Sequence, residues 1–83
     1  MKLYFENSNG ISRQIAECHN ENDVIKEIYN FINLCNKNKP KNQQFKIHYV
    51  REWTEEGKTW YDVGSHSEFF YVDKELDPNA KFK

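Results

Sequence analysis

Apolar residues recur along this 83-residue chain with a period of two near its beginning and in its second half, and with a helical period between them. Leu3 and Phe5 share one face of the segment 2–6, and residues 11–18 alternate less regularly. Between these two segments lie the turn residues Asn-Ser-Asn-Gly at 7–10. Alternation on both sides of an Asn-Gly turn is typical of a β-hairpin. The chain is therefore predicted to begin with two antiparallel strands.

The helical period follows directly and predicts the most regular element of the chain. Asn20 is a good N-cap, and Asp23 in the first turn favours a helix start. The helix should end near Lys37, ahead of Pro40, because a proline cannot continue a helix. Its predicted apolar stripe consists of Val24, Ile28, Phe31 and Cys35, flanked by Ile25 and Ile32. Cys35 is accordingly expected to be buried.

The second half of the chain returns to a period of two. Residues 45–53 and 58–63 alternate, and the segment 68–73 closes the pattern. The first two segments are joined by the turn 54–57, which ends in Gly57, and the last two by a turn or bulge at 64–67. These segments predict a three-stranded antiparallel meander, which the polar loop 36–44 connects to the helix.

The elements together predict an α+β fold in the order ββαβββ, with a single mostly antiparallel sheet and one helix packed on one of its faces. Residues 1–83 are short enough to form a single domain. The C-terminal segment shows no periodicity, so residues 76–83 are predicted to form a frayed tail.

Composition and charge exclude a strongly charged chain and a membrane-spanning helix. The net charge is −1, and no apolar run approaches the length of a membrane span. Residues 1–51 carry a net charge of +3 and residues 52–83 one of −4, which allows a dipolar molecule that orients a charged partner. Cys18 and Cys35 show no CxxC pairing, and no leader segment is evident, so we expect reduced thiols and a cytoplasmic protein in a bacterial host cell.

Residues 62–68 contain the best candidates for chemistry. Asp62, Ser65 and His66 are the residue types of a hydrolase triad. However, adjacent Ser65 and His66 would project apart in a tight turn, and no GxSxG elbow is present. The chain also lacks metal-ligand spacing and a glycine-rich phosphate loop. We therefore predict no enzyme activity, no metal and no cofactor, and we expect Gly64 to permit a bend while Asp62 or Glu68 holds His66.

The aromatic residues suggest where a partner would bind. Six of the thirteen aromatics lie between residues 51 and 73, and one helix can cover only one face of the sheet. We expect Leu3, Phe5, Ile47, Tyr49 and Tyr61 to face the helix, together with Phe69 or Phe70. Tyr4, His48, Val50, Trp60 and the remaining phenylalanine then point to the open face. Either the sheet's twist, the long loop and the tail cover these rings, or the rings form a docking surface.

The segment Tyr61-Asp62-Val63-Gly64-Ser65-His66-Ser67-Glu68-Phe69-Phe70-Tyr71 resembles a pattern in small proteins of phages and mobile elements from low-GC Gram-positive bacteria. No established activity is tied to that pattern. Length, Asn/Lys-rich composition and the lack of catalytic motifs also resemble phage accessory proteins. Several of these proteins are stoichiometric inhibitors of host defence, including anti-CRISPR proteins. Many such inhibitors are strongly acidic, and this nearly neutral chain departs from them in that respect.

The leading hypothesis is a non-enzymatic protein-binding accessory protein of phage or mobile-element origin. It would inhibit a host protein, as anti-CRISPR proteins do, or associate with itself through the open face. The predicted partner-binding residues are Trp53, Glu55, Glu56, Trp60, Tyr61, His66, Glu68 and Phe70. The alternative is a single-stranded nucleic-acid-binding module that uses the same face. A third hypothesis, a small-ligand binder or enzyme at Asp62 and His66, predicts a concave pocket there.

Overall fold

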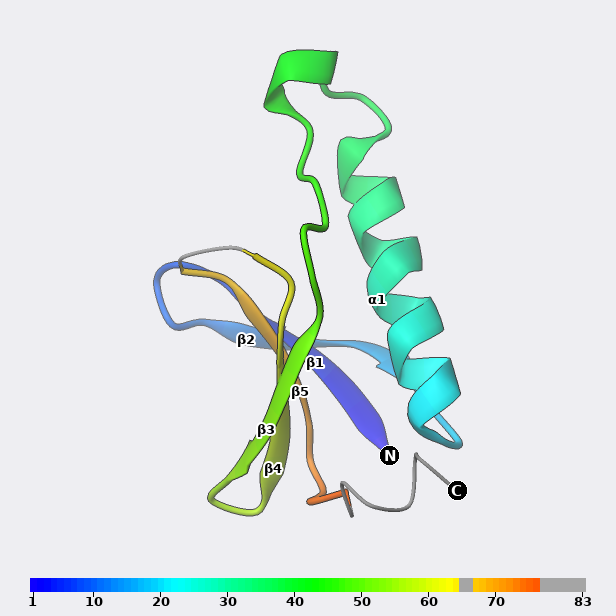
Figure 1. The fold of residues 1–83 in the computed structure, drawn as a ribbon, viewed down its shortest axis with the longest axis vertical. Helices are drawn as coiled ribbons and strands as arrows, with labels where there is room; N and C mark the ends of the chain where they lie inside the picture. Colours follow the sequence, from blue (N-terminus) through cyan, green and yellow to red (C-terminus); the bar gives the residue numbers. More distant parts are fainter. Residues whose placement is uncertain (65–66, 77–83) are drawn as a thin grey trace.

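The computed structural model describes residues 1–64 and 67–76, and within them it shows one helix and five strands (Figure 1). The order is β1 (Lys2–Glu6), β2 (Ser12–Glu17), α1 (Glu21–Asn36), the short 3-10 helix η1 (Lys41–Gln43), β3 (Arg51–Glu55), β4 (Lys58–Asp62) and β5 (Phe69–Val72). The predicted α+β class and the predicted ββαβββ order are therefore confirmed.

The strands form one sheet in the order β2-β1-β5-β4-β3, and all four neighbouring pairs are antiparallel. The C-terminal strand β5 lies in the middle of the sheet, where it joins the β1–β2 hairpin to the β3–β4 hairpin. The edge strands of this sheet are β2 and β3. The β1–β2 register shifts between Leu3 and Tyr4, which marks a bulge in β2, whereas β3 pairs with β4 without interruption.

Both hairpin turns form from local features of the chain, namely side-chain hydrogen bonds in the first turn and positive φ angles in the second. The Asn7 side-chain oxygen accepts hydrogen bonds from the backbone N–H groups of Asn9 and Ile11, at 2.9 and 3.0 Å. Such bonds replace backbone pairing and favour a turn. In the β3–β4 hairpin, Glu56 and Gly57 have φ angles of 53° and 78°. Two residues with positive φ twist the chain in the direction that paired strands require.

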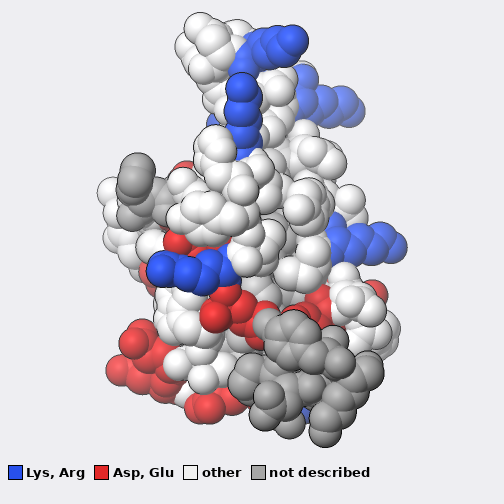
Figure 2. All heavy atoms as spheres, in the orientation of Figure 1, with Lys and Arg blue, Asp and Glu red and all other residues white. Residues whose placement is uncertain are grey.

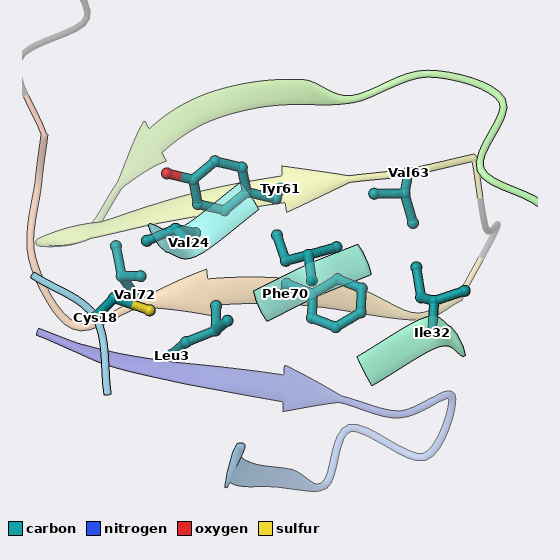
Figure 3. Close-up of a cluster of buried hydrophobic side chains, with 9 residues drawn as sticks. Leu3, Cys18, Val24, Ile32, Tyr61, Val63, Phe70 and Val72 are labelled. Atoms are coloured by element: carbon teal, nitrogen blue, oxygen red, sulfur yellow. The ribbon is translucent and has the colours of Figure 1, made fainter. Parts of the chain in front are cut away.

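The helix begins where the sequence predicts, since the Asn20 side-chain oxygen accepts a hydrogen bond from the Asp23 N–H at 2.9 Å. Val24, Ile28 and Ile32 form the buried line of α1, at a spacing of four residues. Figure 3 shows this line packed against one face of the sheet. The buried core consists of Leu3, Cys18, Val24, Ile28, Ile32, Tyr61, Val63, Phe70 and Val72.

The third strand and the exposure of Cys35 differ from the predictions, whereas α1 ends at Asn36, close to the predicted Lys37. The alternating segment 45–50 is not a strand, and β3 runs from Arg51 to Glu55. The side chain of Asn36 explains the difference, because it bonds both the N–H and the C=O of Phe45 at 2.8 Å and holds that backbone against the helix end. Tyr49 is 52% exposed and does not face the helix. Cys35 is also exposed, since the buried line of α1 follows Ile28 and Ile32.

The chain after β5 is still attached to the sheet at Lys74 and Leu76. Buried Thr59 donates a hydrogen bond to the Lys74 C=O and accepts one from the Leu76 N–H, both at 2.8 Å. Leu76 packs against the core. The sequence pattern shows neither contact, because a single threonine on the helix side of β4 makes both. The remainder of the predicted tail lies outside the described residues.

Candidate functional site

Four aromatic residues form a row across four strands, on the face of the sheet that α1 does not cover. The register places Tyr4 opposite Tyr71, Tyr71 opposite Trp60, and Trp60 opposite Trp53. Neighbouring side chains along a strand point to opposite faces. The row therefore faces away from α1, because the alternate residues of β1, β4 and β5 lie in the core.

The rings of this row contact one another rather than standing apart. Tyr4 and Tyr71 are stacked with centroids 5.0 Å apart, and Trp60 and Tyr71 are 4.7 Å apart. Trp53 stacks with Trp60 at 6.3 Å, and Phe69 meets the Trp53 ring edge-on at 6.2 Å. Such pairs stabilise a sheet by roughly 0.5–1.5 kcal/mol each beyond their buried area. We call these five residues the aromatic face.

Two cations lie over the rings. The Lys58 Nζ atom is 4.7 Å from the Tyr71 centroid and 5.8 Å from that of Trp60, and the Arg51 guanidinium is 5.1 Å from Trp53. Both cations occupy alternate positions on the strands that carry the tryptophans, so they share the same face. Together with ring stacking, they leave Tyr71 only 8% exposed, while the other four rings stay partly exposed.

Asp62 fixes one end of this face. Its carboxylate accepts hydrogen bonds from the Arg51 guanidinium at 3.2 Å, the Tyr49 hydroxyl at 3.4 Å and the Gly64 N–H at 2.9 Å. Asp62 is only 5% exposed, so these partners compensate its burial. Asp62 therefore links the start of β3 to the end of β4 and has a structural role. Ser65 and His66, the other predicted members of a triad, lie outside the described residues.

Gly64 follows Asp62 with a φ of +105°, a conformation that side chains rarely adopt. A Cβ atom built there would lie 3.1 Å from the His48 ring. His48 is held beside this bend, because its N–H donates to the Val63 C=O at 3.3 Å. Gly64, where the predicted turn or bulge begins, therefore lies against the segment that precedes β3.

The structure separates the predicted partner-binding residues into four groups. Trp53 and Trp60 lie on the aromatic face, and Glu55 and Glu56 are exposed at the β3–β4 hairpin. Tyr61 and Phe70 are 0% and 2% exposed and belong to the core, which corrects their assignment to a partner surface. The physical reason is strand parity, because each lies next to a residue of the aromatic face. Glu68 is half-buried, and His66 lies outside the described residues.

Sequence reasoning missed Tyr71 and the two cations, and it left open whether Phe69 or Phe70 lies on the open face. The alternation of side chains between the two faces of a strand is the signal that would have placed these residues. Once Phe70 faces the helix, Phe69 and Tyr71 must face away, and Lys58 and Arg51 follow from the positions of Trp60 and Trp53.

An apolar cavity of about 70 Å³ lies on the other side of the sheet, between β1, β5 and the end of α1. Phe5, Phe31 and Phe70 line it, with Lys39 and Glu68 also in the lining. Its walls belong to the core cluster, since the Phe5 ring lies 4.8 Å from Phe31 and 5.3 Å from Phe70. The cavity is therefore separate from the aromatic face and from Asp62.

Both cysteines are free thiols, and they occupy different surroundings. Cys18 is buried, and this burial raises the pKa of its thiol, with a further contribution from nearby Glu27 and Asp23. A raised pKa disfavours the reactive thiolate. In the ranges 1–64 and 67–76, no group of three His, Cys, Asp or Glu side chains is placed to hold a metal ion.

No family model, no curated protein and no solved structure matches this chain. Among the described residues, no helix has the length and apolar character needed to cross a bilayer.

Proposed function

We propose that this chain is a non-enzymatic protein-binding module that docks on a partner protein through the aromatic face. The observation that carries the proposal is the row Tyr4–Tyr71–Trp60–Trp53 on the side of the sheet away from α1. Tryptophan and tyrosine are enriched at the centres of protein interfaces, where burial of partly exposed rings contributes affinity. The helix packs on one face of the sheet and forms the buried core there, and the aromatic row lies on the opposite face.

The ring geometry favours a protein partner over the alternative, a single-stranded nucleic acid. A base stacks on the flat face of an aromatic side chain. Here Tyr4 and Trp53 each already turn one flat face toward a neighbouring ring, since Tyr4 stacks on Tyr71 with their planes 14° apart and Trp53 stacks on Trp60 at 10°. Lys58 also lies over Tyr71. The surface presents ring edges and flanking charges, which suit apolar side chains and carboxylates of a protein.

The charge distribution supplies a rim that would orient this partner. In Figure 2, Asp and Glu side chains gather over the β3–β4 hairpin, and Lys and Arg side chains surround η1 at the opposite end of the molecule. The hairpin carries Glu55 and Glu56, adjacent to the Trp53 end of the aromatic face. Rim charges of this kind raise the association rate of a complementary partner more than they raise its affinity. We expect a partner with a basic patch next to an apolar one.

The proposed biological setting is a phage or mobile element, with the chain as a stoichiometric inhibitor of a host defence protein, comparable to anti-CRISPR proteins. Two features of the sequence support this setting. The segment 61–71 resembles small phage proteins, and the composition is rich in asparagine and lysine. An inhibitor that acts by occupying a surface needs no catalytic residues, only a rigid face.

The proposal is tested by capture followed by titration. Immobilised chain captures proteins from an extract of its host, and each captured protein is then purified and titrated by calorimetry. Tyr4→Ala and Trp60→Ala should each weaken its affinity at least about tenfold, which corresponds to about 1.4 kcal/mol. Leu34→Ala is the matched control, because Leu34 is 69% exposed on α1 and lies outside the aromatic face. Circular dichroism and urea denaturation confirm that each variant is folded.

Two results contradict the proposal. The first is a partner that binds the folded Trp60→Ala and Tyr4→Ala variants as tightly as the unaltered chain. The second is a salt-sensitive affinity for single-stranded oligonucleotides that Trp60→Ala abolishes, since counterion release accompanies the binding of nucleic acid. That second result would replace the protein partner by the nucleic-acid alternative.

A further inference from the structure

The two edges of the sheet differ in their readiness to pair with another strand. The β2 edge is interrupted by a bulge, a device that discourages edge pairing. The β3 edge is regular, since all five of its residues pair in unbroken register with β4. In the part of the chain that the structure describes, no strand lies beyond β3, and Figure 3 shows it at the margin of the sheet. An uninterrupted edge of five residues is a template for another strand.

The sequence of β3, Arg-Glu-Trp-Thr-Glu, is complementary to itself when it is read in the opposite direction. An antiparallel pair with its two-fold axis at Trp53 places Arg51 of one copy opposite Glu55 of the other, and this happens twice by symmetry. All three side chains lie on the aromatic side of the sheet, because they alternate with Glu52 and Thr54. We propose that two copies of this chain associate through their β3 strands in this register.

The backbone pattern supports the same register. Glu55 and Lys58 enclose the two-residue turn, so they form a hydrogen-bonded pair, and such pairs recur at every second residue along the ladder. Trp53 and Arg51 therefore direct their backbone groups toward β4, and Thr54 directs its own away from the sheet. In the proposed dimer the two Trp53 residues meet at a non-hydrogen-bonded position, where opposite side chains approach most closely.

The dimer would also extend the aromatic row and cover further apolar surface. Tyr4, Tyr71, Trp60 and Trp53 of one copy would continue through Trp53 of the second copy into its own row. Val50 is 38% exposed, and the same register brings it alongside the second copy's hairpin turn. This inference goes beyond the proposed function and does not rest on it, because pairing uses the strand edge and leaves Tyr4 and Trp60 accessible.

A shift of register is disfavoured by charge. Moving the two-fold axis from Trp53 to Glu52 places the two Glu52 side chains directly opposite each other, and like charges at such positions destabilise a sheet. It also removes both Arg51–Glu55 pairs. The register centred on Trp53 is therefore the one in which β3 meets its own copy with matched charges and matched rings.

Sedimentation equilibrium of the full chain from about 1 µM to 1 mM tests the proposal. The expected result is a concentration-dependent species of twice the 10.1 kDa chain mass. Glu55→Arg should raise the dimer dissociation constant about tenfold or more, since it turns both attractive pairs into repulsive ones. The charge-conserving variant Glu55→Asp should retain dimerisation, because it keeps both attractive pairs and leaves Arg51 in place beside the buried Asp62 carboxylate.

Thr54→Pro gives an independent test. It removes an N–H that points out of the sheet, so the intrachain β3–β4 ladder keeps its hydrogen bonds while edge pairing is blocked. A monomer at every concentration would overturn the proposal, and so would a dimer that is insensitive to both Glu55→Arg and Thr54→Pro. Failure here leaves the Tyr4→Ala and Trp60→Ala tests of partner binding unaffected, so the two proposals fail separately.

Discussion

Replacing Tyr61 by phenylalanine removes one oxygen atom from the centre of the core, and we expect this change to stabilise the fold. Tyr61 is 0% exposed, and its hydroxyl has no hydrogen-bond partner among the described residues. Leaving such a group buried and unpaired costs about 1–3 kcal/mol relative to its hydration in the unfolded chain. Phenylalanine keeps the ring against the core and removes that cost.

The expected gain in the free energy of unfolding is therefore about 1 kcal/mol or more at neutral pH. For a domain of this size, 1 kcal/mol raises the Tm by roughly 4–8 °C. A second effect appears in alkali. Burial raises the pKa of the Tyr61 hydroxyl in the folded state. As the pH rises through about 10, the unfolded chain loses this proton while the folded chain retains it, so stability falls above that pH.

Urea denaturation of the two proteins between pH 7 and pH 11 measures both effects. The difference in free energy of unfolding between Tyr61→Phe and the unaltered chain should be positive at pH 7. It should widen above pH 10, with a limiting slope of about 1.4 kcal/mol per pH unit. A variant that is less stable at pH 7 would show that the Tyr61 hydroxyl is hydrogen-bonded in solution. A difference that stays constant in alkali would show that this hydroxyl loses its proton as readily in the folded chain as in the unfolded one, and therefore that water reaches it.

Three further predictions test the fold. Phe70→Ala should cost about 3–5 kcal/mol in urea denaturation, whereas Phe69→Ala, one residue away on the aromatic face, should cost less than half as much; equal costs would refute the assignment of faces. Asn20→Ala should lower stability by about 1 kcal/mol, and Asn20→Asp should retain the cap, so a loss in both variants would argue against capping. Gly64→Ala should lower the Tm, because φ is +105° and the new Cβ would meet the His48 ring at 3.1 Å; an unchanged Tm would show that this bend relaxes freely.

The order of elements could be predicted because each depends on short-range pattern. Asn20 caps α1, residues 7–10 form the first turn, and the buried residues of α1 repeat every four positions. These signals lie within a few residues of the structure they produce. For the same reason the helix and the first hairpin agree closely with the predicted bounds.

The side of the sheet on which each ring lies required information that the pattern does not contain. Six alternating residues from Phe45 to Val50 look like a strand, yet the Asn36 side chain holds the Phe45 backbone, and β3 begins at Arg51 instead. Phe69 and Phe70 are consecutive phenylalanines, so the sequence pattern allows either one to face the helix. The pairing of Phe70 with Phe5 on β1 places Phe70 on the helix side. Contacts between residues distant in sequence therefore decided which aromatic side chains lie on the side of the sheet away from α1.

The aromatic face is the surface that we propose meets another protein, and the chain offers a direct reporter of it. Its two tryptophans, Trp53 and Trp60, both lie on this face. Chain labelled with fluorotryptophan gives one fluorine NMR signal for each residue, and the partner remains unlabelled. We predict that saturation with the captured partner shifts or broadens both signals and lowers their response to a solvent-borne quencher. A saturated complex in which both signals keep their free positions and their full solvent response would contradict the account.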